Sequence, residues 1–273
     1  MITRNIFFHS YKGGVGRTYL LANVAIELIN SNYKVGIVDL DYDAPGVSHM
    51  LYKHFNNAKL ETVDKDLVYL LVDDEPMKTN EAVKKFSNDK LLLLSINPHQ
   101  PANRMDRLYD LTLKGGFNKR LFKIINVFID LYKLDFVLFD LRPGFSFLVY
   151  TMANLSDLSF QIFRVTTQDL YGTKILSNAL AAKSDNANVL IPSLIPMSIE
   201  NYEVKLEEIL NREFGNKKVK PIHGQFIPLL QTLLIDDSML VDNLTIDKGS
   251  VEFAKIMETI KSVTERIKGL NDV

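Results

Sequence analysis

The chain has 273 residues, of which 47% are hydrophobic and 24% charged, and these are the values of a globular protein rather than a disordered or fibrous one. Its formal net charge of −1 gives no overall attraction to nucleic acid or membrane, so any such contact must depend on a local patch. The chain contains no cysteine, which excludes disulfides, thiolate zinc sites and cysteine-ligated iron–sulfur clusters.

The first residues, MITRNIFFHSYKGG, lack the apolar core and small-residue cleavage site of a signal peptide. No apolar run approaches the roughly 20 residues that a membrane-spanning helix needs. We therefore expect a soluble, cytoplasmic protein.

Short apolar runs bounded by turn residues recur along the chain and predict buried strands. They are residues 5–10, 34–41, 90–96, 135–141, 158–166 and 187–196. A helix with an apolar face is predicted at residues 19–32, between the first two runs. Near-continuous apolar strands that alternate with helices predict an α/β fold, with a doubly wound, mostly parallel sheet flanked by helices. Ligands of such sheets bind beyond the carboxyl ends of the strands.

Two polar stretches are candidate loops or linkers. Residues 54–66 are polar and residues 211–224 are basic, but neither divides the chain. We therefore predict one domain spanning residues 1–273.

The stretch SYKGGVGRTYL, residues 10–20, follows the first predicted strand and enters the first predicted helix. A glycine-rich turn alone is often no more than a tight connection. Here a cation and a hydroxyl accompany the glycines, and the loop can present backbone N–H groups and a helix N-terminus to an anion. The pattern predicts a phosphate-binding loop in which Thr18 coordinates Mg²⁺ and Arg17 faces the β/γ-phosphates.

Carboxylates follow two further strands. Asp39 and Asp41 lie two residues apart at a strand end, so both project to the same side if the chain stays extended. The alternative is that this pair caps a helix or lies in a loop. Asp140 follows the apolar residues FVLF, and residues 142–144, RPG, come next.

These motifs together resemble the ParA/MinD family of P-loop ATPases. KGGVGRT is similar to the family's deviant Walker A loop, KGGxGK[ST], and LDFVLFDLRPGFS resembles its Walker B strand and second switch loop. NVAIELINSNYKVGIVDLDYDAPG resembles the first helix, the second strand and the aspartate pair, while RVTTQDL and QFIPLL stand where the family has later strand ends. The match covers most of the chain and is weakest at residues 50–90.

The resemblance implies a role for each motif residue. The loop would bind ATP through Lys12, Gly13, Gly14, Val15, Gly16, Arg17, Thr18 and Tyr19. Mg²⁺ would be held near Thr18, Asp39, Asp41 and Asp140, with Asp140 contacting a metal-bound water. The two residues expected to act in catalysis are Lys12, which would reach the nucleotide of a second subunit, and Asp41, which would position or activate the attacking water.

Several roles stay open at this point. Arg142 either neutralises charge or forms a local salt bridge, and Gly144 would relay the presence of the γ-phosphate. No chemistry is assigned to Asp43 or His49. VLIPSLIPMS offers no asparagine to read the base, so ATP is implied by resemblance and GTP is not excluded.

Arg17 stands where the family has lysine, and it leads to two hypotheses. A guanidinium keeps the charge and grips phosphate, so we expect nucleotide binding to persist. Accurate placement of charge at the γ-phosphate decides turnover, so hydrolysis is in doubt. The first hypothesis is a nucleotide-dependent homodimer that hydrolyses ATP slowly and positions or regulates a protein partner. The alternative is a nucleotide-binding regulatory or scaffold module with little or no hydrolysis.

Other classes are less favoured. The absence of cysteine excludes the nitrogenase-reductase-like and cluster-carrier branches, and no substrate signature of a ligase-type enzyme is seen. The final stretch, residues 252–270, predicts an amphipathic helix whose polar side mixes Glu and Lys, so packing on the core is preferred to membrane attachment. NKKVK, residues 216–220, is a candidate contact for nonspecific DNA, which the lack of a basic excess does not favour.

Overall fold

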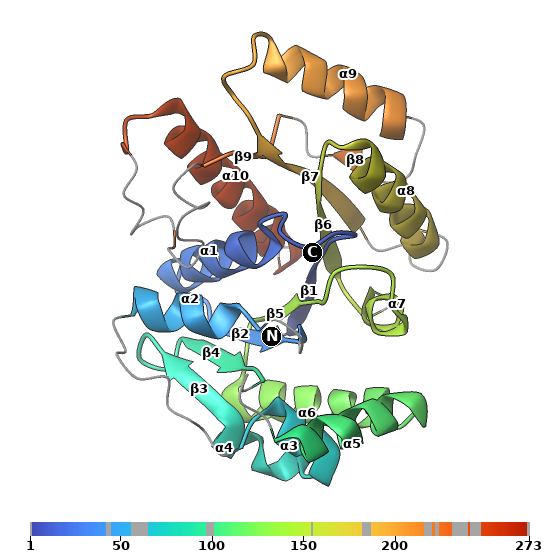
Figure 1. Ribbon diagram of the computed structural model, residues 1–273. Helices are drawn as coiled ribbons and strands as arrows, with labels where there is room; N and C mark the ends of the chain where they lie inside the picture. Colours follow the sequence, from blue (N-terminus) through green and yellow to red (C-terminus); the bar gives the residue numbers. More distant parts are fainter. Residues whose placement is uncertain are drawn as a thin grey trace.

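The computed structural model describes most of the chain (Figure 1). The described residues are 2–41, 45–55, 65–96, 101–153, 155–181, 187–215, 220–221, 224–230, 240 and 247–271. Asp43 lies outside them, as does NKKVK apart from its last residue.

The described strands form one nine-stranded sheet, and every pairing except β3 with β4 is parallel. The strand order is β3-β4-β2-β5-β1-β6-β7-β8, and β9 also pairs with β7. The strands are β1 (Arg4–His9), β2 (Val35–Asp39), β3 (Val83–Phe86), β4 (Leu91–Leu94), β5 (Phe136–Asp140), β6 (Leu158–Arg164), β7 (Ala187–Ile195), β8 (Lys220–Pro221) and β9 (Ile227–Pro228).

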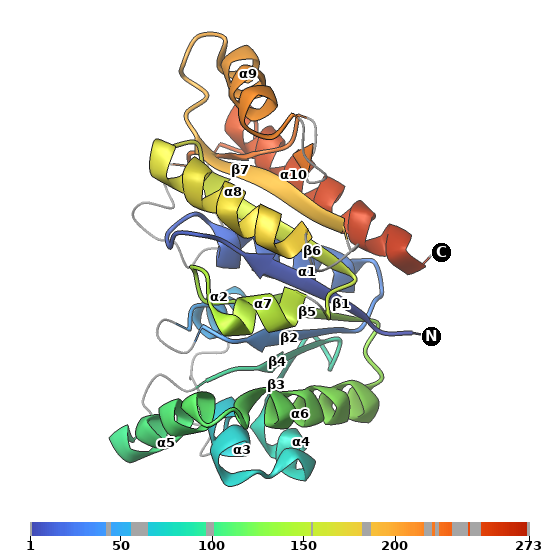
Figure 2. The same ribbon diagram turned by 90° about the vertical axis from the view of Figure 1, so that its right-hand side faces the viewer.

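Helices cover both faces of the sheet (Figures 1 and 2). The α-helices are α1 (Arg17–Asn30), α2 (Val47–His54), α3 (Leu67–Asp73), α4 (Thr79–Ala82), α5 (Ala102–Leu113), α6 (Phe117–Tyr132), α7 (Phe147–Ala153), α8 (Thr167–Ala181), α9 (Tyr202–Phe214) and α10 (Val251–Lys268). Two short 3₁₀ helices are η1 (Pro76–Lys78) and η4 (Gly269–Asn271). The predicted doubly wound, mostly parallel sheet is confirmed.

Alternating side chains of the central strands divide the core between the two faces. On β1, Ile6 and Phe8 join the cluster that contains α1, α2 and α10, whereas Phe7 joins the cluster that contains α3 and α6. Phe7 stacks on Phe139 of β5 with ring centroids 4.6 Å apart. This period-two burial on both faces explains why the parallel strands are almost continuously apolar.

The last helix uses its apolar face inside the protein. Ile256, Ile260, Val263 and Ile267 are all buried in the same cluster as α1, and Leu270 packs against that cluster. The structure therefore agrees with the expectation that residues 252–270 pack on the core rather than attach to a membrane. Among the described helices, none has both the length and the apolar character needed to cross a membrane.

Three strands, namely β3 and the two-residue strands β8 and β9, were not among the apolar runs predicted from the sequence. β3 pairs antiparallel with β4 through a tight turn in which Ser87, Asn88 and Asp89 all have positive φ. Its four residues, VKKF, are half polar, as expected for a short strand at the edge of a sheet. It lies in the region, residues 50–90, where the family resemblance is weakest.

The strand order places three carboxyl ends side by side. β5 lies between β1 and β2, with Asp140 opposite Phe8 on one side and Asp39 on the other. The glycine-rich loop after β1 and the aspartates of β2 and β5 therefore meet at the same edge of the sheet.

Candidate functional site

The loop between β1 and α1 has a backbone conformation that depends on glycine. Gly14 and Gly16 have φ values of 66° and 80°, in the left-handed region that other residues rarely adopt. Gly13 and Gly14 are exposed, whereas Val15 is 2% exposed and anchors the loop in the core. The loop thus presents exposed backbone at the N-terminus of α1, as a phosphate-binding loop requires.

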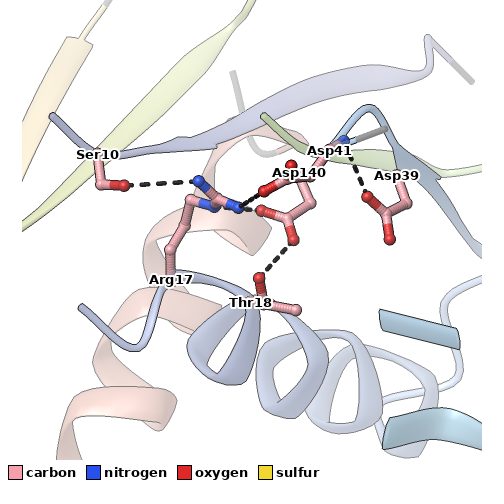
Figure 3. Close-up of polar contacts among 6 residues, drawn as sticks. All are labelled: Ser10, Arg17, Thr18, Asp39, Asp41 and Asp140. Carbon is pink, nitrogen blue, oxygen red and sulfur yellow. Dashed lines mark hydrogen bonds and ion pairs between the residues drawn. The ribbon is translucent and has the colours of Figure 1, made fainter. Parts of the chain in front are cut away.

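Arg17, the first residue of α1, turns into the protein toward two carboxylates (Figure 3). Its Nε donates to Asp140 Oδ1, and its Nη2 donates to Asp41 Oδ2 at 3.0 Å. Its Nη1 lies 3.5 Å from Ser10 Oγ. The side chain is 7% exposed. Burial opposes its charge, but the attraction of Asp140 and Asp41 is stronger, so the pKa of Arg17 is raised.

Asp140 receives a second hydrogen bond from the helix. Thr18 Oγ1 donates to Asp140 Oδ2 at 2.6 Å. Burial raises the pKa of Asp140, although Arg17 and the Thr18 hydroxyl both act to lower it. Asp140 therefore joins the loop to β5 through two side chains of α1.

Asp39 lies on the other side of this cluster and is not contacted by Arg17 in Figure 3. Its Oδ1 accepts the backbone N–H of Asp41 at 3.0 Å, and its Oδ2 is buried with no hydrogen-bond partner among the described residues. Burial, followed by repulsion from Asp140, raises the pKa of Asp39 well above its usual value. A buried carboxylate oxygen without a partner is costly unless it serves a ligand.

The oxygen atoms of the cluster fit a Mg²⁺ ion held partly by another molecule. A hydroxyl and carboxylates are the ligands that Mg²⁺ prefers, and the unpartnered oxygen of Asp39 is available for such a role. Among the described residues, no group of three or more His, Asp or Glu side chains is arranged to hold a metal by itself. Mg²⁺ would therefore need waters, or waters together with phosphate oxygens of a ligand, to complete its shell.

Two other predicted loop residues have distinct surroundings. Lys12 is half-buried, with its Nζ 5.9 Å from the centroid of the Tyr11 ring. Tyr19 is 4% exposed and its side chain belongs to the core, so any nucleotide contact would come from its main chain. Tyr11 in turn packs on α8, because a Cβ added at Gly172 would lie 2.0 Å from its ring.

The loop after β5 touches the glycine-rich loop. Gly144, with φ 98°, donates its N–H to the carbonyl oxygen of Ser10 at 2.9 Å. Pro143 lies beside Gly13, since a Cβ at Gly13 would be 3.8 Å from the proline ring. Arg142 and Phe145 are exposed. A ligand that moves either loop would therefore affect the other. His49, to which the sequence assigned no chemistry, is exposed on α2.

Sequence reasoning overlooked two buried basic residues. His9 is 1% exposed, and neither ring nitrogen has a hydrogen-bond partner among the described residues. Burial, together with the charge of Arg17, lowers the pKa of His9 from 6.5 to about 3. Its position as the last residue of β1, immediately before the loop, was the available signal.

The second overlooked residue is Lys84 on β3, which is 9% exposed. Its Nζ lies 3.3 Å from Ser95 Oγ, and that hydroxyl lies 3.0 Å from Ser48 Oγ. Burial lowers the pKa of Lys84, and the nearby charges of Asp66 and Asp39 oppose this effect. No sequence pattern indicated this residue, because the strand that carries Lys84 was not predicted.

Comparisons with known proteins find relatives in sequence and in fold. A family model described as "ParA: NUBPL iron-transfer P-loop NTPase" matches residues 1–195. An iron–sulfur cluster carrier protein of Clostridium perfringens is 24% identical over 186 residues, which cover 68% of this chain and 60% of that relative. A protein of the same name from Methanocaldococcus jannaschii is 23% identical, with 98% of this chain and 86% of the relative covered. The septum site-determining protein MinD of Pyrococcus horikoshii, solved with Mg-ADP, has a TM-score of 0.69 at 17% identity and 96% coverage of both chains.

Proposed function

The chain belongs to the ParA family of P-loop NTPases, and we propose that it binds ATP with Mg²⁺ and acts as a nucleotide-dependent homodimer. In this proposal, slow hydrolysis releases the dimer, and the cycle positions or regulates a protein partner. The observation that carries the proposal is the hydrogen bond between Thr18 and Asp140, which joins the helix after the glycine-rich loop to the carboxylate of β5. A P-loop NTPase uses such a hydroxyl and such a carboxylate at its metal.

The proposed roles follow from where the residues lie. The exposed backbone at Gly13 and Gly14 and the N-terminus of α1 would receive the phosphates. Mg²⁺, when bound, would neutralise charge on the phosphate oxygens. Thr18 would be its hydroxyl ligand, and Asp140 and Asp39 would hold waters of its shell.

Two residues are proposed to act on the reaction itself. Asp41 lies between Arg17 and Asp39 (Figure 3) and would orient the attacking water or accept its proton. Lys12, which is half-buried on the loop, would extend to the nucleotide of the partner subunit. MinD of Pyrococcus horikoshii, which shares the fold, was solved with Mg-ADP, and this supports the choice of ligand.

A second candidate function is a nucleotide-binding regulatory or scaffold module with little or no hydrolysis. The contacts of Arg17 favour it, because its guanidinium is paired with Asp41 and Asp140. An arginine engaged in this way places less positive charge at the γ-phosphate, where phosphoryl transfer needs it. Replacing Arg17 with lysine and measuring phosphate release separates the two functions, since only the second predicts a strong rise in turnover.

The cargo named for the relatives is not proposed for this chain. Two relatives are called iron–sulfur cluster carrier proteins, and such clusters are held by cysteine thiolates. This chain has no cysteine, so its own residues do not fit a cluster. We propose instead an unidentified protein partner, with nonspecific DNA and membrane less favoured because the net charge is −1.

The test is the mass in solution, measured by sedimentation with Mg-ATP, with Mg-ADP and without nucleotide. We expect a dimer only with Mg-ATP, and a monomer in all conditions for Lys12→Ala. Lys123→Ala is the matched control, because Lys123 is exposed on α6, a helix that contributes no residue to the site. A mass that is the same in all three conditions would reject the dimer switch. Repeating the series with GTP decides between the two nucleotides.

A further inference from the structure

We propose that Arg17 is a positioning residue that takes the place of a divalent cation in the nucleotide-free protein by holding Asp41 and Asp140 together. The contacts of Arg17 with these two aspartates are called the guanidinium clamp. The proposal rests on the proposed function only in taking Asp140 as a carboxylate of the metal site. It assigns Arg17 a role that does not require contact with phosphate.

The first argument is the geometry of the side chain. Each of the three guanidinium nitrogens has an oxygen neighbour, namely Asp140 for Nε, Asp41 for Nη2 and Ser10 for Nη1. A planar fork can donate in several directions at once, whereas lysine carries one nitrogen on a flexible stem. A lysine at position 17 would therefore not hold both carboxylates in the same geometry.

The second argument is the balance of charge. Asp39, Asp41 and Asp140 are 0%, 6% and 0% exposed, so three carboxylates are buried at this edge of the sheet. Arg17 is the cation that contacts two of them. Buried like charges repel strongly unless a cation or a proton compensates them. Removing the guanidinium leaves a cluster of carboxylates that a divalent cation would satisfy.

The third argument is what the clamp connects. Arg17 begins α1, Asp41 follows β2 and Asp140 ends β5, so one side chain joins three segments that are separate in the sequence. These segments carry the loop, the proposed water-positioning aspartate and the proposed metal aspartate. Fixing them before nucleotide arrives reduces the ordering that binding would otherwise require.

The clamp predicts how the nucleotide-free protein responds to metal. The wild-type protein already has an internal cation between Asp41 and Asp140, so Mg²⁺ alone should stabilise it little. A variant without the guanidinium should gain stability from Mg²⁺, because an ion that binds the folded state raises the melting temperature. No nucleotide is involved, so a failure of the dimer switch would leave this expectation intact.

The experiment measures melting temperatures without nucleotide, in EDTA and in Mg²⁺ at matched ionic strength. At about 10 mM Mg²⁺ we expect a rise of roughly 3 °C for Arg17→Gln and of less than about 1 °C for the wild type. Arg17→Lys should respond between the two. Arg164→Gln is the control, because Arg164 pairs with Asp169 outside the cluster and should respond like the wild type.

A double variant keeps the test decisive if Arg17→Gln folds poorly. Arg17→Gln with Asp41→Asn removes the cation together with one of the carboxylates it holds, so it should melt above Arg17→Gln in EDTA. A wild-type response to Mg²⁺ as large as that of Arg17→Gln would overturn the proposal. So would a double variant that is no more stable than Arg17→Gln. An Arg17→Lys response equal to that of the wild type would reject the requirement for the fork.

Discussion

Two neighbouring strands of the sheet each lead into a helix through a turn that pairs an arginine with aspartate. After β1, Arg17 contacts Asp41 and Asp140, which are 24 and 123 residues away. After β6, Arg164 contacts Asp169, only 5 residues away. The first pairing joins distant segments, whereas the second joins the end of β6 to the first turn of α8.

The two turns also differ in burial and in charge balance. The side chain of Arg17 is 7% exposed and faces more than one buried carboxylate, whereas that of Arg164 is 39% exposed and faces one. Asp169 is also held by the Thr166 hydroxyl, in the manner of a residue that caps a helix. Arg164 and Asp169 form a local pair of one positive and one negative charge, which stabilises the start of α8. An unbalanced, long-range cluster is costly for stability, which points to a functional site.

The largest expected effect comes from removing each arginine in turn. Arg17→Gln should lower the free energy of unfolding by about 3–5 kcal/mol, because it leaves buried carboxylates without their cation. Arg164→Gln should cost about 1 kcal/mol or less, because its exposed guanidinium is screened by water. Denaturant unfolding in EDTA measures both values. Equal losses for the two variants would contradict the distinction between the turns.

The strands, the helix and the loop around Arg17 were predicted from the sequence, but the ion pairs that distinguish the two turns were not. The central strands and α1 were predicted because their apolar runs are nearly continuous, which follows from burial on both faces. The loop was predicted from its glycines, two of which do adopt positive φ. The sequence predicted that Arg17 faces the β/γ-phosphates, but its contacts with Asp41 and Asp140 were not predicted, since no local pattern indicates contacts with carboxylates 24 and 123 residues away.

Other features that were not predicted from the sequence, among them the strand β3 and two buried basic residues, were missed for similar physical reasons. β3 was missed because a short edge strand with polar residues lacks the apolar run that reveals a central strand. Lys84 was therefore missed as well. His9 lies inside a predicted strand, yet only the packing shows that its ring nitrogens have no partner among the described residues.

The next largest effect should appear in acid and concerns His9, which burial and Arg17 keep neutral. The pKa of His9 is about 3 in the folded protein, whereas its ordinary value, taken for the unfolded chain, is 6.5. Between these pH values the unfolded chain therefore binds a proton that the folded chain does not. Stability should therefore fall as the pH falls from 6.5 toward 3, by about 1.4 kcal/mol per pH unit from this residue.

The matched variant for this test is His9→Leu, which has no titrating group at that position. Unfolding free energies measured at several pH values between 7.5 and about 4.5 should diverge, with the wild type losing roughly 3 kcal/mol more than the variant. Carboxylates are common to both proteins, so their contribution cancels in the difference. Parallel pH profiles would show that His9 is protonated in the folded state or does not titrate in this range.

Replacing Asp39 should have the opposite effect, which is a rise in the free energy of unfolding. Its buried Oδ2 has no partner among the described residues, and burial and repulsion from Asp140 disfavour its charged form, so it should destabilise the nucleotide-free fold. Asp39→Asn should raise the free energy of unfolding in EDTA by about 2 kcal/mol, because it removes the charge and keeps the shape. The same variant should weaken the effect of Mg²⁺ on nucleotide affinity. A loss of stability would mean that Asp39 is compensated in the folded protein.

The smallest expected difference lies between two threonines that each bond an aspartate near the start of a helix. Thr18 donates to Asp140 at 2.6 Å, and Thr166 donates to Asp169 at 2.9 Å. Replacing either with alanine should cost about 1 kcal/mol, the usual effect of losing one such hydrogen bond or cap. Stability alone therefore does not distinguish the two turns.

Nucleotide affinity measured with and without Mg²⁺ does distinguish them. Thr18→Ala should lose most of the gain in affinity that Mg²⁺ provides, because the hydroxyl is the proposed ligand of the ion. Thr166→Ala should keep that gain in full, since its hydroxyl serves only the start of α8. If both variants kept the Mg²⁺ effect, Thr18 would be a structural partner of Asp140, and the two turns would differ in charge but not in function.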